Sequence, residues 1–319
     1  MAKSITGIHA ATSFADRIAD KAINNVSLWP GATIVHVDQA VGSDANTGGL
    51  TWEKPYATLD AAIDFARYQF GTTTISYTDK NRRFVVLVKP GHYNETSLWW
   101  SGYNLSVIGC GPAVPGKDYG VSINYDGGET STAAFLMSGS GNSLENVHVY
   151  CDAAIPAVYL YNGDNNLIRN CVIEADGTNC TYGIKADSVK GSRIEGNVIQ
   201  NTATAGIYLD GGADRYFIEG WIRNNHIHSN VANTTGILVD VDMLSYNAWI
   251  DHNFVSLTNG ASCKGIDVNT TSLGPCVTDN YVSVPSSATP IEHAGGDQFL
   301  MGNHTAAGTT NADPNPAAG

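Results

Sequence analysis

A short pattern returns seven times between residues 144 and 305 of this 319-residue chain. Each copy has an apolar residue, in most copies an Asn three places on, and a second apolar residue five places on. The copies begin at Leu144, Ile168, Ile194, Ile222, Ile250, Val277 and Leu300, at intervals of 23 to 28 residues. A period in this range is typical of repeat proteins, whose units stack on their neighbours. We therefore expect a solenoid.

The other two regular features of the repeat indicate strands. The fifth position is β-branched and apolar in six of the seven copies, as a buried strand prefers: Val149, Ile173, Ile199, Ile227, Val255, Val282 and Thr305. A Gly-Ile pair, or a close variant, also recurs at residues 157–158, 183–184, 206–207, 236–237, 265–266 and 290–291. Gly before an inward Ile suits the corner where a coil re-enters its first sheet. Leucine-rich repeats and left-handed helices need shorter periods or hexapeptide units, so we predict an all-β, right-handed parallel β-helix with three sheets.

The third position of the repeat carries five consecutive Asn residues. The column reads Val147, Cys171, Asn197, Asn225, Asn253, Asn280 and Asn303. Asn tolerates left-handed backbone angles, so we expect these residues to turn the chain between two strands. Stacked at the strand spacing of about 4.8 Å, their side-chain amides can bond to one another. They are predicted to be a structural ladder rather than ligands.

The chain before the repeats predicts a strand near residue 33, a Gly- and Asn-rich loop, and a helix from about Thr58 to Tyr68. Thr58 is the expected N-cap, and Ala62, Phe65 and Ala66 share one face. We divide the chain into an N-terminal arm (1–32), a strand and helix that cap the solenoid (33–100), the coils (101–306) and a tail (307–319).

Composition and charge exclude several classes of partner. The net charge of −13 repels nucleic acid and anionic membranes, and no apolar stretch is long enough to span a bilayer. Six cysteines without metal-ligand spacing are expected to be buried free thiols. His226 and His228 share a face near Glu219, but we expect solvated histidines there and no metal.

The region before the coils resembles the opening of the pectin-lyase-like β-helix family. The residues that carry the resemblance are Val37, Asp38, Gly42, Ser43, Asp44, Asn46, Gly48, Pro55, Thr58, Leu59, Ala62, Ile63, Pro90, Gly91, His92 and Glu95. Among members of the family, the chain is most similar to virion-associated proteins of tailed bacteriophages. The resemblance covers residues 33 to about 305 and implies the same fold, with the helix capping its open end.

One motif suggests catalysis by this resemblance, because residues 249–252 read W-I-D-H, as in pectate lyases of the fold. The calcium-binding carboxylates and paired arginines expected around such a motif are missing downstream. Asp251 instead closes a column of alternating charge: Glu145, Arg169, Glu195, Arg223 and Asp251. Outward neighbours one strand apart would attract each other, so we expect Asp251 to pair with Arg223.

A second candidate site lies three places after the Gly-Ile column. The positions are Asp187, Asp210, Asp240 and Asn269. Stacked carboxylates repel, so they need solvent, a cation or a raised pKa. Lys185 and Tyr208 project from the same sheet and are candidates for a catalytic base or acid. The alternative is that each Asp caps a turn through backbone amides.

Two functions remain open. The first is a non-catalytic structural protein of a phage virion, assembled in the host cytoplasm. It would be a homotrimeric capsid decoration, cement or spike protein that contacts the major capsid protein, or another virion protein, through residues 1–32. The second is a polysaccharide lyase or glycoside hydrolase acting on an acidic polysaccharide, tailspike-like or secreted, through Asp187, Asp210 and Asp240. It needs no cofactor unless a lyase requires Ca²⁺. Either function admits carbohydrate as a partner.

Overall fold

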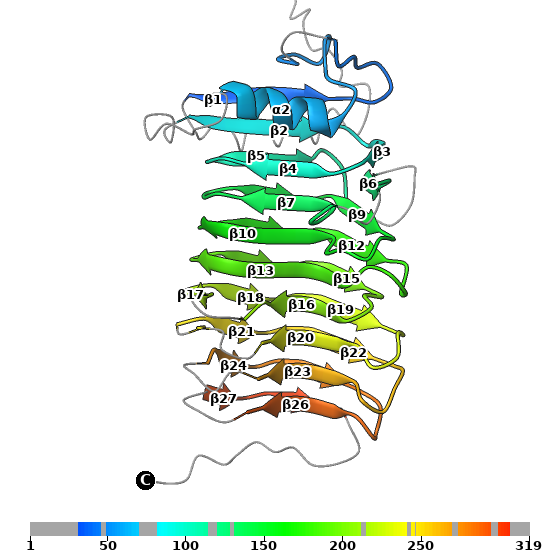
Figure 1. The fold of residues 1–319 in the computed structure, drawn as a ribbon, viewed down its shortest axis with the longest axis vertical. Helices are drawn as coiled ribbons and strands as arrows, with labels where there is room; N and C mark the ends of the chain where they lie inside the picture. The colour runs from blue at the N-terminus through cyan, green and yellow to red at the C-terminus, as the bar shows by residue number, and fades with distance from the viewer. Residues whose placement is uncertain are drawn as a thin grey trace, which may run out of the picture.

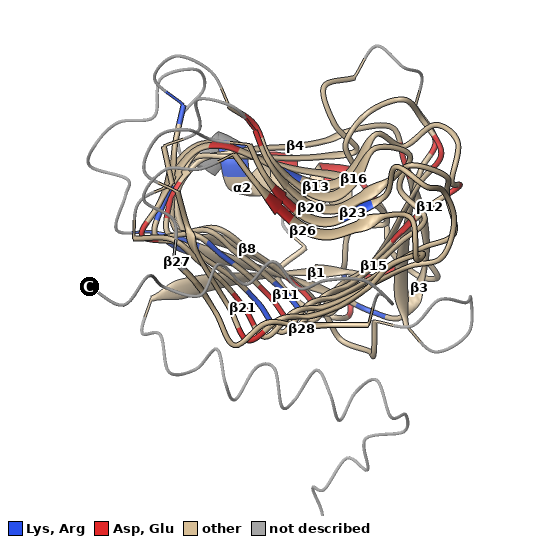
Figure 2. Cartoon of the chain, turned by 90° about the horizontal axis from the view of Figure 1, so that it is seen from below, with Lys and Arg blue, Asp and Glu red and all other residues tan. Residues whose placement is uncertain are grey.

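The computed structural model shows the predicted right-handed parallel β-helix (Figure 1). It describes residues 31–45, 49–69, 82–113, 120–127, 131–211, 215–240, 244–245, 247–269, 274–294 and 299–306. Most of the arm and the whole tail lie outside these ranges. Within them, three parallel sheets enclose one apolar core, and Figure 2 looks along the axis of the solenoid. Among the described residues, no helix is long and apolar enough to cross a bilayer.

Each coil contributes one strand to each sheet in turn. Sheet A contains β1 (Ala32–Val37), β2 (Arg83–Val88), β5 (Leu105–Gly109), β8 (Ser143–Glu145), β11 (Leu167–Arg169), β14 (Arg193–Glu195), β18 (Trp221–Arg223), β21 (Trp249–Asp251), β24 (Cys276–Thr278) and β27 (Phe299–Met301). Sheet B contains β3 (Gly91–Glu95), β6 (Val121–Tyr125), β9 (His148–Cys151), β12 (Val172–Ala175), β15 (Val198–Gln200), β19 (His226–Ser229), β22 (Phe254–Leu257), β25 (Tyr281–Ser283) and β28 (His304–Thr305). Sheet C contains β4 (Leu98–Ser101), β7 (Phe135–Ser138), β10 (Val158–Asp164), β13 (Tyr182–Lys190), β16 (Ala205–Leu209), β20 (Thr235–Val239), β23 (Lys264–Val268) and β26 (Thr289–His293). The short β17 (Phe217–Ile218) adds to the end of β13.

The repeat predicts the register of all three sheets. Residues at the first repeat position pair across sheet A from Leu144 to Leu300, and those at the fifth pair across sheet B. The Gly-Ile column pairs across sheet C from Val158 to Ile291. The first complete coil is β2–β3–β4, so the coils begin earlier than residue 101, where we placed their start. All six cysteines are free, and all but Cys276 are buried.

The five Asn residues form a continuous buried ladder beside the turn from sheet A to sheet B. In each Asn except the last, Asn303, the backbone N–H and the side-chain amide donate to the Oδ1 of the next Asn, at 3.0 Å in both bonds from Asn197 to Asn225. The same amide also donates to a backbone carbonyl of the coil before. Our reason for the Asn was wrong in one respect, because the left-handed angle falls one residue earlier. Gly196, Asn224, His252, Asp279 and Gly302 have φ between 54° and 69°.

The helix α2 (Leu59–Gln69) packs over the first strands of the solenoid, at the end shown in blue in Figure 1. Its N-terminus is held by three of the residues that carried the family resemblance. Thr58 Oγ1 accepts from the N–H of Ala61 at 3.2 Å, as an N-cap does. Asp44 Oδ1 accepts from the N–H of Thr58 at 3.0 Å, and Glu95 Oε1 accepts from that of Leu59 at 2.7 Å. This part of the motif is therefore an anchor for the capping helix.

Candidate functional site

The outward surface of sheet C carries the predicted acidic column and a second column beside it. The second column lies one place after each inward apolar residue: Trp99, Leu136, Tyr159, Lys185, Tyr208, Leu238, Asp267 and Glu292. Register places each residue directly above the next. The column is uncharged over its first three coils and ends in two acidic residues, Asp267 and Glu292.

Asp187 is buried among groups that neutralise it. Asp187 is 2% exposed. One of its carboxylate oxygens accepts a hydrogen bond from Tyr159 Oη at 3.2 Å, and the other accepts one from Ser188 Oγ at 2.6 Å. Arg215 Nε lies 3.5 Å from the same carboxylate. These partners are side chains, so the turn-capping interpretation through backbone amides does not hold for Asp187.

Asp210 and Asp240 share the phenol of Tyr208. Tyr208 Oη lies 2.9 Å from Asp210 Oδ1 and 2.6 Å from Asp240 Oδ2. Lys185 Nζ lies 2.8 Å from Asp210 Oδ2, and Arg215 Nη1 also contacts that oxygen. Asp210 is 7% exposed. The structure thus brings Asp187, Asp210 and Asp240 together with Lys185 and Tyr208, and two cations lie among the three carboxylates. We name this group, with Tyr159 and Arg215, the acidic cluster.

The tyrosines of the acidic cluster act as hydrogen-bond donors. Burial raises the pKa of Tyr208 far above its usual value, and the hydrogen bonds to Asp240 and Asp210 raise it further. Burial and the carboxylate of Asp187 do the same to the pKa of Tyr159. A phenol with a raised pKa keeps its proton at neutral pH, so Tyr208 is present in these contacts as a protonated donor.

Asn269 belongs to a separate group in the coil after Asp240. Its Nδ2 donates to Asp267 Oδ2 at 3.1 Å, and Lys264 Nζ lies 2.8 Å from the same oxygen and 3.0 Å from Glu292. Burial alone would lower the pKa of Lys264, but its bonds to Asp267 and Glu292 raise it. One lysine here serves two carboxylates, so the group keeps a formal negative charge, and Asp267 Oδ1 has no hydrogen-bond partner among the described residues.

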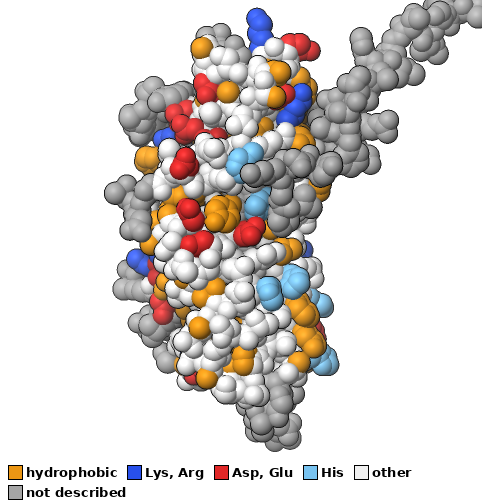
Figure 3. Space-filling model, turned by 90° about the vertical axis from the view of Figure 1, so that its right-hand side faces the viewer, with side chains coloured by type: hydrophobic (Ala, Val, Ile, Leu, Met, Phe, Trp, Pro, Cys, Tyr) orange, Lys and Arg blue, Asp and Glu red, His pale blue; other side chains and the backbone are white. Residues whose placement is uncertain are grey.

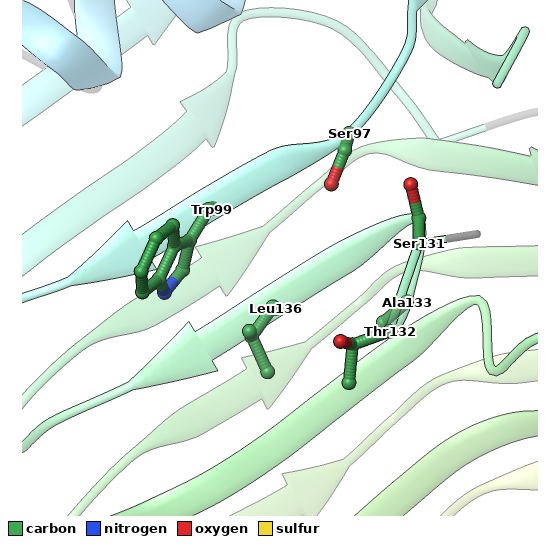
Figure 4. Close-up of a pocket in the computed structure, with 6 residues that line it drawn as sticks. All are labelled: Ser97, Trp99, Ser131, Thr132, Ala133 and Leu136. Carbon is green, nitrogen blue, oxygen red and sulfur yellow. The ribbon is translucent and has the colours of Figure 1, made fainter.

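A pocket of about 270 Å³ opens at the other end of sheet C, over β4 and β7 (Figure 4). It is lined by Ser97, Trp99, Ser131, Thr132, Ala133 and Leu136. Trp99 is 51% exposed, and the guanidinium of Arg67 lies 4.9 Å from the centre of its ring. Among the described residues, an aromatic ring, hydroxyl groups and apolar side chains line the pocket, and none of the lining side chains is charged.

A sequence profile described as a right-handed β-helix region matches residues 118–303. The chain belongs to the right-handed β-helix family. No curated protein matches it by sequence. Among solved structures, the pectin methylesterase of Aspergillus niger in deglycosylated form is similar over 88% of this chain and 87% of its own, with a TM-score of 0.50 and 14% identity. At that identity the likeness shows the fold alone.

Two further solved structures are similar at lower scores. The alignment with the lacto-N-biosidase of Eubacterium ramulus covers 91% of this chain and 70% of the biosidase chain, with a TM-score of 0.41 and 9% identity. The alignment with the Dettilon tailspike protein covers 90% of this chain and 74% of the tailspike chain, with a TM-score of 0.30 and 12% identity.

The alternating charges of this β-helix protein line sheet A as stripes of both signs (Figure 2). The column comprises Glu145, Arg169, Glu195, Arg223 and Asp251. Arg169 Nη2 lies 2.5 Å from Glu145, and Arg223 Nη2 lies 3.0 Å from Glu195. Asp251 is beside Arg223 in the register, but its carboxylate contacts Nδ1 of His252 at 2.9 Å. The column is therefore two ion pairs, and Asp251 does not pair with Arg223 as we expected.

The outward face of sheet B carries a column of rings at its later coils. Phe254 stacks on Tyr281 with ring centres 5.0 Å apart, and His226 meets the edge of Phe254 at 4.8 Å. Phe254 is 41% exposed and Tyr281 43%. Figure 3 shows histidines gathered beside apolar side chains on this side of the molecule. Glu219 pairs with Lys190, and the described residues contain no cluster of three metal-ligating side chains.

Some residues of the acidic cluster and of the group around Asn269 were not predicted from the sequence. Tyr159 and Asp267 lie one place after inward residues of the Gly-Ile column, so the same register, extended by one place, finds them. Arg215 lies in the connection after β16, at no periodic position. Only the folded chain brings it to Asp187 and Asp210.

Proposed function

We propose that this β-helix protein is a non-catalytic structural component of a tailed-phage virion, a homotrimer that decorates the capsid or forms a spike. Burial and neutralisation of Asp187 and Asp210 carry this proposal, because a catalytic carboxylate must reach its substrate. The resemblance of residues 37–95 to virion-associated proteins supports the location. Assembly would take place in the host cytoplasm, and contact with a capsid protein through residues 1–32 is part of the same proposal.

The trimer would be built on the ring column of sheet B. Its exposed members lie at matching positions of successive coils, so the column runs parallel to the axis. When copies of the chain associate with parallel axes, the rings of one column can pack against the rings of another along the whole column. An unrelated partner would need a matching column of its own. Exposed apolar surface of this kind is typical of a protein interface.

The mass of the purified protein in solution tests the assembly. We expect three times the chain mass of 33.8 kDa for the wild type, and dissociation in Phe254→Asp/Tyr281→Asp. Tyr161→Asp, at an exposed ring of sheet C, is the matched control and should stay trimeric. A monomeric wild type contradicts the trimer.

One observation favours the second candidate, a polysaccharide lyase or glycoside hydrolase. The phenol of Tyr208 bridges two carboxylates, whose nearest oxygens are then close enough for the paired-carboxylate geometry of retaining hydrolysis, about 5–5.5 Å. A pectin methylesterase also shares the fold. Such an enzyme would be virion-borne or secreted, and a lyase would need Ca²⁺.

An assay for degradation separates the two functions. The wild type and Asp187→Asn/Asp210→Asn are incubated with polygalacturonate, methylated pectin and alginate, each with Ca²⁺ and with a chelator. We expect no new reducing or unsaturated ends from either protein. Products that appear with the wild type and vanish with the variant would refute the structural role and establish the enzyme.

A further inference from the structure

The pocket over β4 and β7 has features of a ligand site that the structural role does not use. Its volume of about 270 Å³ is near the lower end of the range for small-molecule sites, roughly 300–1,000 Å³. Trp99 and Leu136 come from paired positions of the two strands, and Ser97 and Ser131 lie before those strands. Figure 4 shows Ser97 and Ser131 near each other at one end and the indole ring at the other.

The indole ring of Trp99 has the guanidinium of Arg67 over it and is otherwise partly exposed. Arg67 covers it at 4.9 Å and is itself fixed by Asp64 at 2.8 Å. The guanidinium lies over the ring and Trp99 is still 51% exposed, so a large part of the residue remains in contact with water. A large flat apolar surface left in water costs free energy unless a ligand or partner covers it.

The remaining lining fits a ligand with hydroxyl groups and no charge. Ser97, Ser131 and Thr132 each supply a hydroxyl that can donate and accept, and the described residues offer none of the three a hydrogen bond. No described lining residue is charged, and the neighbouring guanidinium of Arg67 is already paired with Asp64 at 2.8 Å, so the described part of the pocket offers a charged ligand no unpaired counter-ion. A pyranose ring presents an apolar C–H face to stack on indole and a rim of hydroxyls to bond with Ser and Thr.

The geometry points to a binding site for an uncharged sugar, one or two pyranose residues of a glycan, stacked on Trp99 and bonded by Ser97, Ser131 and Thr132. The site requires no catalytic group. It also lies on the same face as the acidic cluster but in different coils, so a binding site here does not depend on chemistry at Asp187 or Asp210.

Calorimetric titration of the full chain with maltoheptaose, cellohexaose and chitohexaose, and with oligogalacturonate as the charged comparison, tests the site. We expect saturable binding of at least one uncharged sugar, weaker by roughly tenfold in Trp99→Ala. Trp249→Ala is the matched control, since Trp249 is 40% exposed on sheet A, and should bind as the wild type does.

Thr132→Lys gives a second, independent arm, because it fills the pocket with a charged chain and should abolish binding. Thermal melting of each variant shows whether it is folded. Absence of saturable binding for all three uncharged sugars would overturn the inference. So would equal losses in Trp99→Ala and Trp249→Ala, or binding of oligogalacturonate alone that disappears in Lys185→Met.

Discussion

Replacement of Asn225 by Ala removes the middle of the Asn ladder. Asn225 Oδ1 accepts from the backbone N–H and the side-chain amide of Asn197, both at 3.0 Å. Its own amide donates to Asn253 Oδ1 at 3.0 Å and to the carbonyl of Ile194 at 2.9 Å. Asn225 is buried, so water does not replace these partners in the folded protein.

The expected cost follows from the donors that lose their acceptor. The backbone N–H of Asn197 loses its acceptor, and the Asn197 amide keeps only its bond to the carbonyl of Ile168. A buried donor left without an acceptor costs about 1–3 kcal/mol, so Asn225→Ala should lower the free energy of unfolding by about 2–5 kcal/mol. Asn225→Asp should cost at least as much at neutral pH, because a carboxylate places charge where the ladder needs a donor.

Urea unfolding followed by circular dichroism measures the loss, and the midpoint should fall while the slope stays the same. Asn224→Gly is the matched control. Asn224 is exposed and has φ 54°, a conformation that Gly adopts freely, so its replacement should change stability by less than about 1 kcal/mol. If Asn225→Ala costs no more than Asn224→Gly, the ladder does not stabilise the solenoid and the reasoning fails.

Three further predictions concern the cap, the corner and the acidic cluster. Burial raises the pKa of the Glu95 carboxyl to about 7 from 4.5, so the folded state binds its proton more tightly. The contribution of Glu95 to the free energy of unfolding is fully present below pH 4.5. It falls by up to about 3 kcal/mol as the pH rises to about 7. Glu95→Gln keeps an acceptor for the N–H of Leu59, so its free energy of unfolding should change less between pH 4.5 and 7 than that of the wild type. If the difference in stability between wild type and variant is the same at pH 4.5 and pH 7, the prediction is wrong. Gly206→Ala places a Cβ 2.6 Å from Ile227 Cγ2 and 2.8 Å from the carbonyl of Gly236, and urea unfolding should show a loss of about 1–3 kcal/mol. Tyr208→Phe removes the donor between Asp210 and Asp240 and should cost about 1–3 kcal/mol by the same measurement, whereas Tyr161→Phe at an exposed ring should cost little. Equal effects of the two Tyr variants would show that the bridging phenol does not stabilise the cluster.

The sequence predicts the fold well because stacking makes like positions touch. Ile194, Ile222 and Ile250 are paired neighbours in space as they are equivalents in the repeat. A period therefore determines a register, and the register determines which residues share a column. Detail within one turn is less predictable, as the left-handed residue shows, since Asn224 and Asn225 are the same residue type with different roles.

The candidate site is predictable only in part. The column Asp187, Asp210 and Asp240 follows from the register, but its partners depend on side-chain directions and on a connection without a period. Arg215 reaches two of the carboxylates from such a connection, and Asp251 turns to His252 although Arg223 is equally near in the register. Which of two neighbours a charged group chooses depends on local packing, which a repeat pattern does not contain.

Stacking also limits where a β-helix can place function. Each outward group faces the same position one coil away, about 4.8 Å along the axis, so a column of like charges must be neutralised or broken. This chain neutralises: Arg alternates with Glu on sheet A, and Lys185, Arg215 and Tyr208 lie among the acids of sheet C. A carboxylate balanced in this way links neighbouring coils through its ion pairs and hydrogen bonds. Uncharged positions in a column need no such neutralisation. In the first coils of sheet C these positions are occupied by Trp99 and Leu136, which line the pocket that we propose as a ligand site.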